Sequence, residues 1–115
     1  MAYPVNIARI QTTIPNAGSL SPELDCGAQI LVGIGMPAAW NAAALTFQVS
    51  LDGTTWIEMQ GASGVLTYNA AAGQYVAVDP ALWRGVTALK VRSGTLVSPV
   101  AQGAGCTLTL VFRTV

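Results

Sequence analysis

Few side chains in this 115-residue sequence could take part in acid–base or nucleophilic chemistry. Histidine is absent, which removes the commonest general base, the commonest metal ligand and the Ser-His and Cys-His nucleophile pairs. The carboxylates are Glu23, Asp25, Asp52, Glu58 and Asp79. Only Glu23 and Asp25 lie close together in the sequence, in a segment typical of a solvated loop. Glu58 lies in an expected strand and has no evident partner.

Two other chemistries can be judged from residue spacing. Gly33-Ile34-Gly35 is the nearest approach to a phosphate-binding glycine loop, but Ala38 stands where the third glycine would be. No long helix is expected to follow it. Two cysteines without a histidine do not make a zinc site. We therefore expect no cofactor, no metal and no enzymatic activity.

Cys26 and Cys106 each begin an apolar segment that we expect to be a strand. A disulfide between them would close a loop of about 80 residues and contribute roughly 4 kcal/mol. The N-terminus lacks a basic stretch followed by an apolar core, so we expect the chain to be made and kept in a cytoplasm, where thiols remain reduced, or to be exported only as part of a larger assembly. Two buried free thiols are the favoured interpretation, and a disulfide is the alternative.

The composition narrows the range of partners. Only 9% of the residues are charged, against roughly 25% in typical soluble domains, and the formal net charge is zero. A neutral chain has no basic excess for nucleic-acid phosphates, and no apolar run is long enough for a membrane-spanning helix. We expect neither nucleic acid nor membrane as a partner. Low charge favours a surface that other proteins cover, and four basic residues, Arg84, Lys90, Arg92 and Arg113, are interpreted as solvated strand ends.

The central stretch, residues 43–60, predicts a β-hairpin. Residues 45–50 (LTFQVS) alternate apolar and polar side chains, which places the apolar ones on one face of a strand. Asp52-Gly53 predicts a tight turn, because glycine tolerates positive φ and aspartate bonds its own backbone. Trp56 follows in the second strand, as a half-buried anchor beside the turn.

Residues 50–56 (SLDGTTW) resemble the Asp-box hairpin of sialidases and related β-proteins, with one residue fewer between the aspartate and the glycine. That resemblance implies a structural role, in which Asp52 and Trp56 brace the turn. Residues 79–85 (DPALWRG) predict a capped helical turn, with Asp79 at the cap, Pro80 at the first helical position and Gly85 at the exit.

The remaining apolar segments are short and separated by turn signals. We expect strands within residues 5–14, 26–36, 65–68, 74–78, 86–92 and 106–115, in addition to the hairpin. About seven or eight short strands without a long helix indicate an all-β fold. The predicted architecture is a single domain, residues 1–115, folded as an antiparallel β-sandwich of jelly-roll or immunoglobulin-like type. Residues 1–15 are expected to be an arm or an edge strand.

Three stretches carry a resemblance to a protein family: residues 40–56 (WNAAALTFQVSLDGTTW), residues 78–80 (VDP) with Gly85, and residues 89–95 (LKVRSGT) with the Pro99, Val100 and Gln102 that follow. Together they resemble a group of small structural proteins of tailed bacteriophages, over roughly residues 30–113. The resemblance implies a virion structural component and brings no catalytic or binding residues with it.

The leading functional hypothesis is a capsid decoration or cement subunit that binds the outside of the head shell and joins neighbouring capsomers. Its expected partners are the major capsid protein, other virion proteins and copies of itself, and its expected location is the virion. Candidate contacts are residues 1–15 and 93–105. Tyr3, Trp40 and Trp83 are the candidate interface side chains.

Two alternatives remain open. One is a tail or fibre module that binds a host glycan by stacking it on Trp40, Tyr68, Tyr75 or Trp83, although packing in the core is favoured for all four. The other is a neck or tail adaptor.

Overall fold

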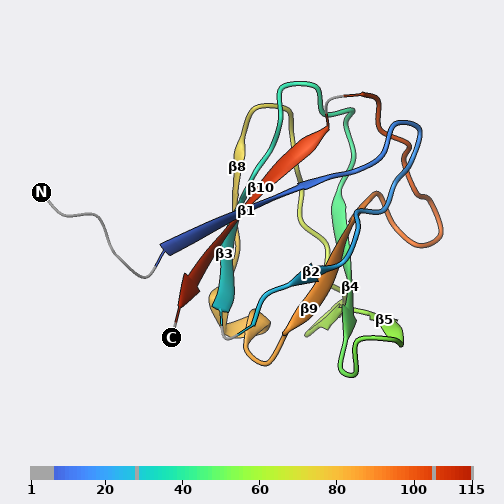
Figure 1. The fold of residues 1–115 in the computed structure, drawn as a ribbon. Coiled ribbons are helices and arrows are strands. Elements are labelled where there is room, and N and C mark those ends of the chain that lie inside the picture. Colours follow the sequence, from blue (N-terminus) through green and yellow to red (C-terminus); the bar gives the residue numbers. More distant parts are fainter. Residues whose placement is uncertain (1–6, 28, 105, 115) are drawn as a thin grey trace, which may run out of the picture.

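The computed structural model describes residues 7–27, 29–104 and 106–114. Two four-stranded antiparallel sheets pack face to face in it (Figure 1). The first sheet contains, in spatial order, β1 (Ile7–Thr13), β10 (Thr107–Thr114), β3 (Gln29–Gly35) and β8 (Tyr75–Ala77). The second contains β2 (Leu24–Asp25), β9 (Ala88–Ser93), β4 (Leu45–Ser50) and β5 (Trp56–Glu58). The expected all-β antiparallel sandwich is confirmed.

The strand pairings are nested. β1 pairs with β10, β2 with β9, β3 with β8 and β4 with β5, so the chain folds back on itself as one long double ribbon. This ribbon is rolled up, because β10 also pairs with β3 and β9 also pairs with β4. That order is the jelly-roll topology, one of the two arrangements expected. A small hairpin of β6 (Gln60–Gly61) and β7 (Gly64–Val65) and a 3-10 helix, η1 (Pro80–Trp83), lie between β5 and β9.

The core lies between the two sheets and follows the period-two pattern of the strands. Leu108, Leu110 and Phe112 of β10 are fully buried and alternate with residues that face outward. On the opposite sheet the inward residue Phe47 is equally buried. Its ring makes edge-to-face contacts with Trp83 at 4.8 Å and with Tyr68 at 5.9 Å between centroids. The 3-10 helix is thereby fixed to the core by its last residue.

The hairpin of β4 and β5 forms as expected, but its turn is wider than the Asp52-Gly53 signal predicts. Ser50 is the last residue of β4 and pairs with Trp56, so residues 51–55 form the connection. The Asp52 carboxylate accepts hydrogen bonds from the backbone N–H groups of Thr54 and Thr55 at 2.9 and 2.8 Å. One carboxylate oxygen, Oδ1 of Asp52, thus accepts from two successive backbone N–H groups and closes the turn.

The polar face of β4 is not open to solvent. Thr46 is fully buried and its hydroxyl donates to the carbonyl of Gly94 at 2.7 Å. Arg92 of β9, 5% exposed, lies opposite Thr46 and forms two hydrogen bonds with the Glu58 carboxylate at 2.5 and 2.7 Å. Gln48 also donates to Glu58, at 3.1 Å.

Two expectations from the sequence are therefore wrong. Glu58 has a partner, and Arg92 is a buried member of an ion pair and not a solvated strand end. The hydrogen bonds from Arg92 lower the pKa of Glu58 below its usual range. The register that joins β4 to both β5 and β9 brings these side chains together.

Cys26 and Cys106 are both buried and both free. This agrees with the interpretation as two buried thiols. Burial raises the pKa of Cys26 to about 11 and also raises the pKa of Cys106. Both groups are therefore protonated and unreactive in the folded protein at neutral pH.

Candidate interaction surface

The loop between β9 and β10, one of the two segments expected to make contacts, contains a tightly closed turn at residues 94–99. Gly94 and Pro99 form an isolated antiparallel bridge. Ser98 donates its backbone N–H to the Thr95 hydroxyl at 2.9 Å, and Thr95 donates its own N–H to the carbonyl of Ser98 at 3.2 Å. Gly94 has φ of +86°, and a Cβ there would lie 2.5 Å from the Ser98 carbonyl oxygen, so only glycine fits.

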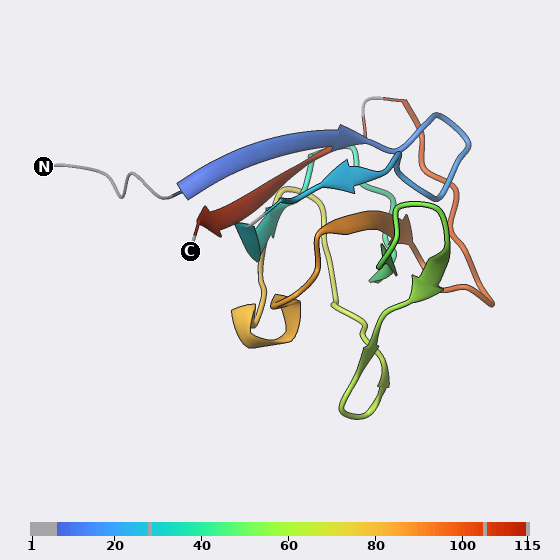
Figure 2. The same cartoon turned by 60° about the horizontal axis from the view of Figure 1, so that its bottom comes forward.

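This 94–99 turn holds two aliphatic side chains in solvent. Leu96 is 62% exposed and Val97 is 91% exposed. Scattered exposed apolar residues are ordinary on protein surfaces, but these two are adjacent and lie at the tip of a hydrogen-bonded turn. The turn projects beyond the sheets in both views (Figure 1, Figure 2). Its apolar tip is thus presented in a fixed conformation.

The base of the turn is attached to the second sheet and to the loop after β1. Gly94 donates its N–H to the carbonyl of Ala44 at 2.7 Å and accepts from the Thr46 hydroxyl. Ser93 donates its N–H to the carbonyl of Ser19, also at 2.7 Å. The turn therefore cannot shift without disturbing β4.

Gln102, only 2% exposed, ties together the loops at this end of the sandwich. Its Nε2 donates to the carbonyl of Asn41 at 2.9 Å and to the Ser93 hydroxyl at 2.8 Å, and its Oε1 accepts from the N–H of Asn41 at 2.8 Å. Its backbone accepts from the N–H of Ala17 and donates to the carbonyl of Gly18. Three loops, preceding β2, β4 and β10, are joined through this one residue.

The candidate interface tryptophans lie inside the domain. Trp40 is 5% exposed and donates its indole N–H to the carbonyl of Ala43, and Trp83 is 1% exposed. Packing, the favoured interpretation, is confirmed for both, and their assignment as interface residues is wrong. Tyr68 is half-buried against the core, which leaves Tyr75, 58% exposed, as the exposed member of the four aromatic candidates. Tyr3 lies outside the described residues.

The residues expected to have structural roles at the two turns do so. Hydrogen bonds from the N–H groups of Thr55 and Thr54 hold the pKa of Asp52 well below its usual range, and Gly53 has φ of +83°. Trp56 is half-buried, and the Lys90 ammonium lies 4.4 Å from its ring centroid, within cation–π range.

The predicted capped turn at residues 79–85 forms as a 3-10 helix. The Asp79 carboxylate accepts from the N–H of Ala81 at 3.1 Å, Pro80 is the first helical residue, and Gly85 has φ of +85° at the exit. The predicted cap, start and exit are confirmed.

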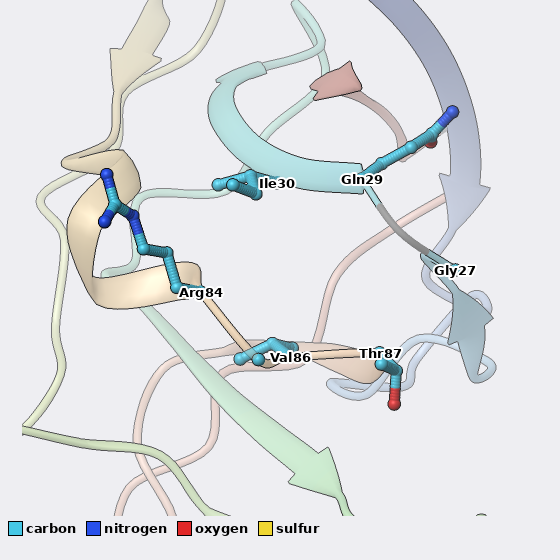
Figure 3. A pocket seen from close by; sticks show the side chains of 7 residues that line it. Gly27, Gln29, Ile30, Arg84, Val86 and Thr87 are labelled. Carbon is cyan, nitrogen blue, oxygen red and sulfur yellow. The ribbon is translucent and has the colours of Figure 1, made fainter. Parts of the chain in front are cut away.

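The described surface has several shallow hollows. Glu23, Asp25 and Asp52 are among the residues that line one of them. Another is lined by Gly27, Gln29, Ile30, Arg84, Gly85, Val86 and Thr87. Figure 3 shows the apolar Ile30 and Val86 on opposite sides of it. Within the described part of the chain, no three His, Cys, Asp or Glu side chains come close enough to hold a metal ion. The described residues also contain no helix long and apolar enough to cross a membrane.

The chain was compared with protein-family models and with curated proteins. No protein-family model matches the chain, and no curated protein matches it. The resemblance to phage structural proteins therefore stays a prediction that rests on the three sequence stretches alone.

Proposed function

We propose that the chain is a structural subunit of a bacteriophage virion, of the decoration or cement type, which binds the outside of the head shell and joins neighbouring capsomers. The observation that carries this proposal is the 94–99 turn, which holds Leu96 and Val97 in solvent. Val97 is the most exposed aliphatic side chain of the described residues, and Leu96 lies next to it on the same hydrogen-bonded turn, so the turn is suited to seat both side chains in a partner protein.

The turn offers a favourable balance of energies for such a contact. Burying one leucine or valine side chain contributes about 1.5–3 kcal/mol. Because the turn is already closed by its own hydrogen bonds, little conformational entropy is lost when it binds. A contact of this size is weak by itself, and an assembly that presents several linked copies of the turn binds more strongly.

Composition and fold are compatible with this role and do not by themselves select it. A chain with 9% charged residues has little charge repulsion between neighbouring copies. Jelly rolls occur in viral capsid domains and also in lectins, so the topology does not decide between a shell subunit and a glycan-binding module. The glycan hypothesis has less support, because Trp40 and Trp83 are buried and cannot supply a stacking face.

The test is the copy number of the chain in purified particles of the phage that encodes it, measured by quantitative mass spectrometry. A decoration subunit should be present in copies on the order of hundreds, as the symmetry of a shell requires. A number near one ring of subunits would move the chain to the neck or tail. Absence from the particle would refute a virion role.

A further inference from the structure

The edges of the two sheets differ in length. β2, β5 and β8 have two or three residues each, whereas β1 has seven and pairs with β10 in an unbroken register. Long edges are usually blunted by proline, by lysine or by a bulge, because they can pair with another chain. β1 (IARIQTT) contains no proline, and its single charge is Arg9. Figure 2 shows it along the outer border of the sandwich.

The direction of the β1 backbone groups follows from its pairing. Ile14 donates its N–H to the carbonyl of Cys106, in continuation of the β1–β10 register. In an antiparallel ladder, every second residue bonds to the same neighbour. The residues in phase with Ile14 therefore bond to β10, and those that direct N–H and C=O groups to the open side are Ile7, Arg9, Gln11 and Thr13.

We infer that β1 pairs in an antiparallel manner with β1 of a second copy of this chain, about a two-fold axis at Ile10. In this register, Arg9 lies opposite the partner's Gln11, and Ile7 lies opposite the partner's Thr13. All four open-side residues of each copy are then paired, which gives about eight hydrogen bonds. The two first sheets become one continuous sheet across the dimer, with an isologous interface.

Charge and apolar burial favour this register over its neighbours. A shift by two residues in one direction places Arg9 opposite the partner's Arg9, which is a repulsive cross-strand pair. A shift by two residues in the other direction places Ile7 opposite the partner's Pro15, which has no N–H to donate. Ile10 is half-buried at the border of the core, and the pairing covers it with the partner's Ile10.

The partner is therefore identified as a second copy by the self-complementary register of β1. This inference concerns β1 and does not depend on the 94–99 turn or on a virion role. If the chain forms no β1 dimer, the copy number in particles can still support a virion role. If the chain is absent from particles, the β1 dimer can still form.

The dimer is tested by sedimentation velocity over a range of protein concentrations at low ionic strength. Gln11→Arg places a guanidinium opposite the partner's Arg9 at two symmetric sites, and we expect the dimer dissociation constant to rise roughly tenfold. Gln11→Glu creates two opposite-charge pairs and should lower that constant by several-fold. Gln60→Arg and Gln60→Glu are the matched controls, because each changes the net charge as the corresponding Gln11 variant does, at an exposed position on β6. Both should leave the dimer dissociation constant unchanged.

A cross-link reads the register directly. The two-fold axis brings the β-carbons of the two Ile10 residues to about 5 Å, so Ile10→Cys should form an intermolecular disulfide on mild oxidation, while Gln60→Cys should not. Cys26 and Cys106 are buried and do not compete. A wild-type chain that stays monomeric at high concentration would overturn the inference. So would a dimer that responds equally to the Gln11 and Gln60 substitutions, because another surface would then join the copies.

Discussion

Asn41 and Gln102, 61 residues apart in the sequence, exchange two hydrogen bonds: the Asn41 N–H donates to Gln102 Oε1 at 2.8 Å, and Gln102 Nε2 donates to the Asn41 carbonyl at 2.9 Å. The side-chain amide of Gln102 thus pairs with a backbone as a neighbouring strand would. Because Gln102 is almost fully buried, its side-chain amide depends on these protein partners. This side chain joins the loop before β4 to the loop that carries the 94–99 turn.

Replacing Gln102 should therefore be strongly destabilising. Gln102→Ala leaves the N–H and C=O of Asn41 and the Ser93 hydroxyl without their partner, which should lower the free energy of unfolding by about 2–4 kcal/mol. Urea denaturation measures the change. Gln60→Ala, at an exposed site, should change the same free energy by less than about 0.5 kcal/mol. Equal effects of the two substitutions would contradict the role given to Gln102.

The Arg92–Glu58 ion pair should make stability depend on acid pH. The pKa of Glu58 is lower in the folded than in the unfolded chain, so its contribution is complete above the unfolded value, about 4.3, and is lost as pH falls through the folded value. Glu58→Gln should lower the unfolding free energy at pH 7, and the difference from wild type should shrink in acid. Urea unfolding from pH 7 to pH 2.5 tests this pH dependence, and Glu23→Gln, at an exposed site, is the control. If the difference in unfolding free energy between Glu58→Gln and wild type does not change with pH, the role given to the ion pair is contradicted.

Gly33 provides space for the ring of Tyr75. A Cβ on Gly33 would lie 1.7 Å from the Tyr75 hydroxyl oxygen, so Gly33→Ala must displace the ring, which can swing into solvent because Tyr75 is exposed. We expect the ring-current shifts that Tyr75 causes on β3 to disappear from the NMR spectrum, with a stability change within about 1 kcal/mol. At Gly35 a Cβ would lie 3.7 Å from Thr109, so Gly35→Ala should preserve those shifts.

The two thiols should report unfolding. Because burial raises their pKa values, Cys26 and Cys106 should react with a disulfide reagent far more slowly in the folded protein than in urea. Without reductant, the denatured chain should titrate two thiols. Titration of none would indicate a disulfide and would contradict the free state of both sulfurs.

Sequence reasoning succeeded where the signal is local. The alternation in β10, the Asp79-Pro80 cap and the bracing of the hairpin turn by Asp52 depend on residues within a few positions of one another, and all three form, although the turn is wider than expected. The Arg92–Glu58 pair spans 34 residues and depends on the register of β9 and β5 with β4, which no short pattern encodes.

The same limit applies to the topology and to the candidate surface. Jelly-roll and immunoglobulin-like sandwiches share their local strand signals and differ in the pairing of distant strands, such as β1 with β10. Residues 93–105 were identified as a candidate contact from their loop-like composition. The hydrogen bonds that hold Leu96 and Val97 in solvent, and the role of Gln102, became visible only in three dimensions.

The most direct test of the account compares incorporation of two variants into phage particles. Leu96→Ser combined with Val97→Ser removes the apolar tip from exposed positions, so the chain should fold as stably as wild type. Leu51→Ser, at an 82% exposed site in the β4–β5 turn, is the matched control.

Particles are assembled with each chain, and copies per particle are counted by quantitative mass spectrometry. The account predicts wild-type and Leu51→Ser chains at shell-like copy number, and a loss of at least about tenfold for the double variant, since two buried aliphatic contacts are removed. Wild-type incorporation of the double variant, or particles that contain no wild-type chain, would contradict it.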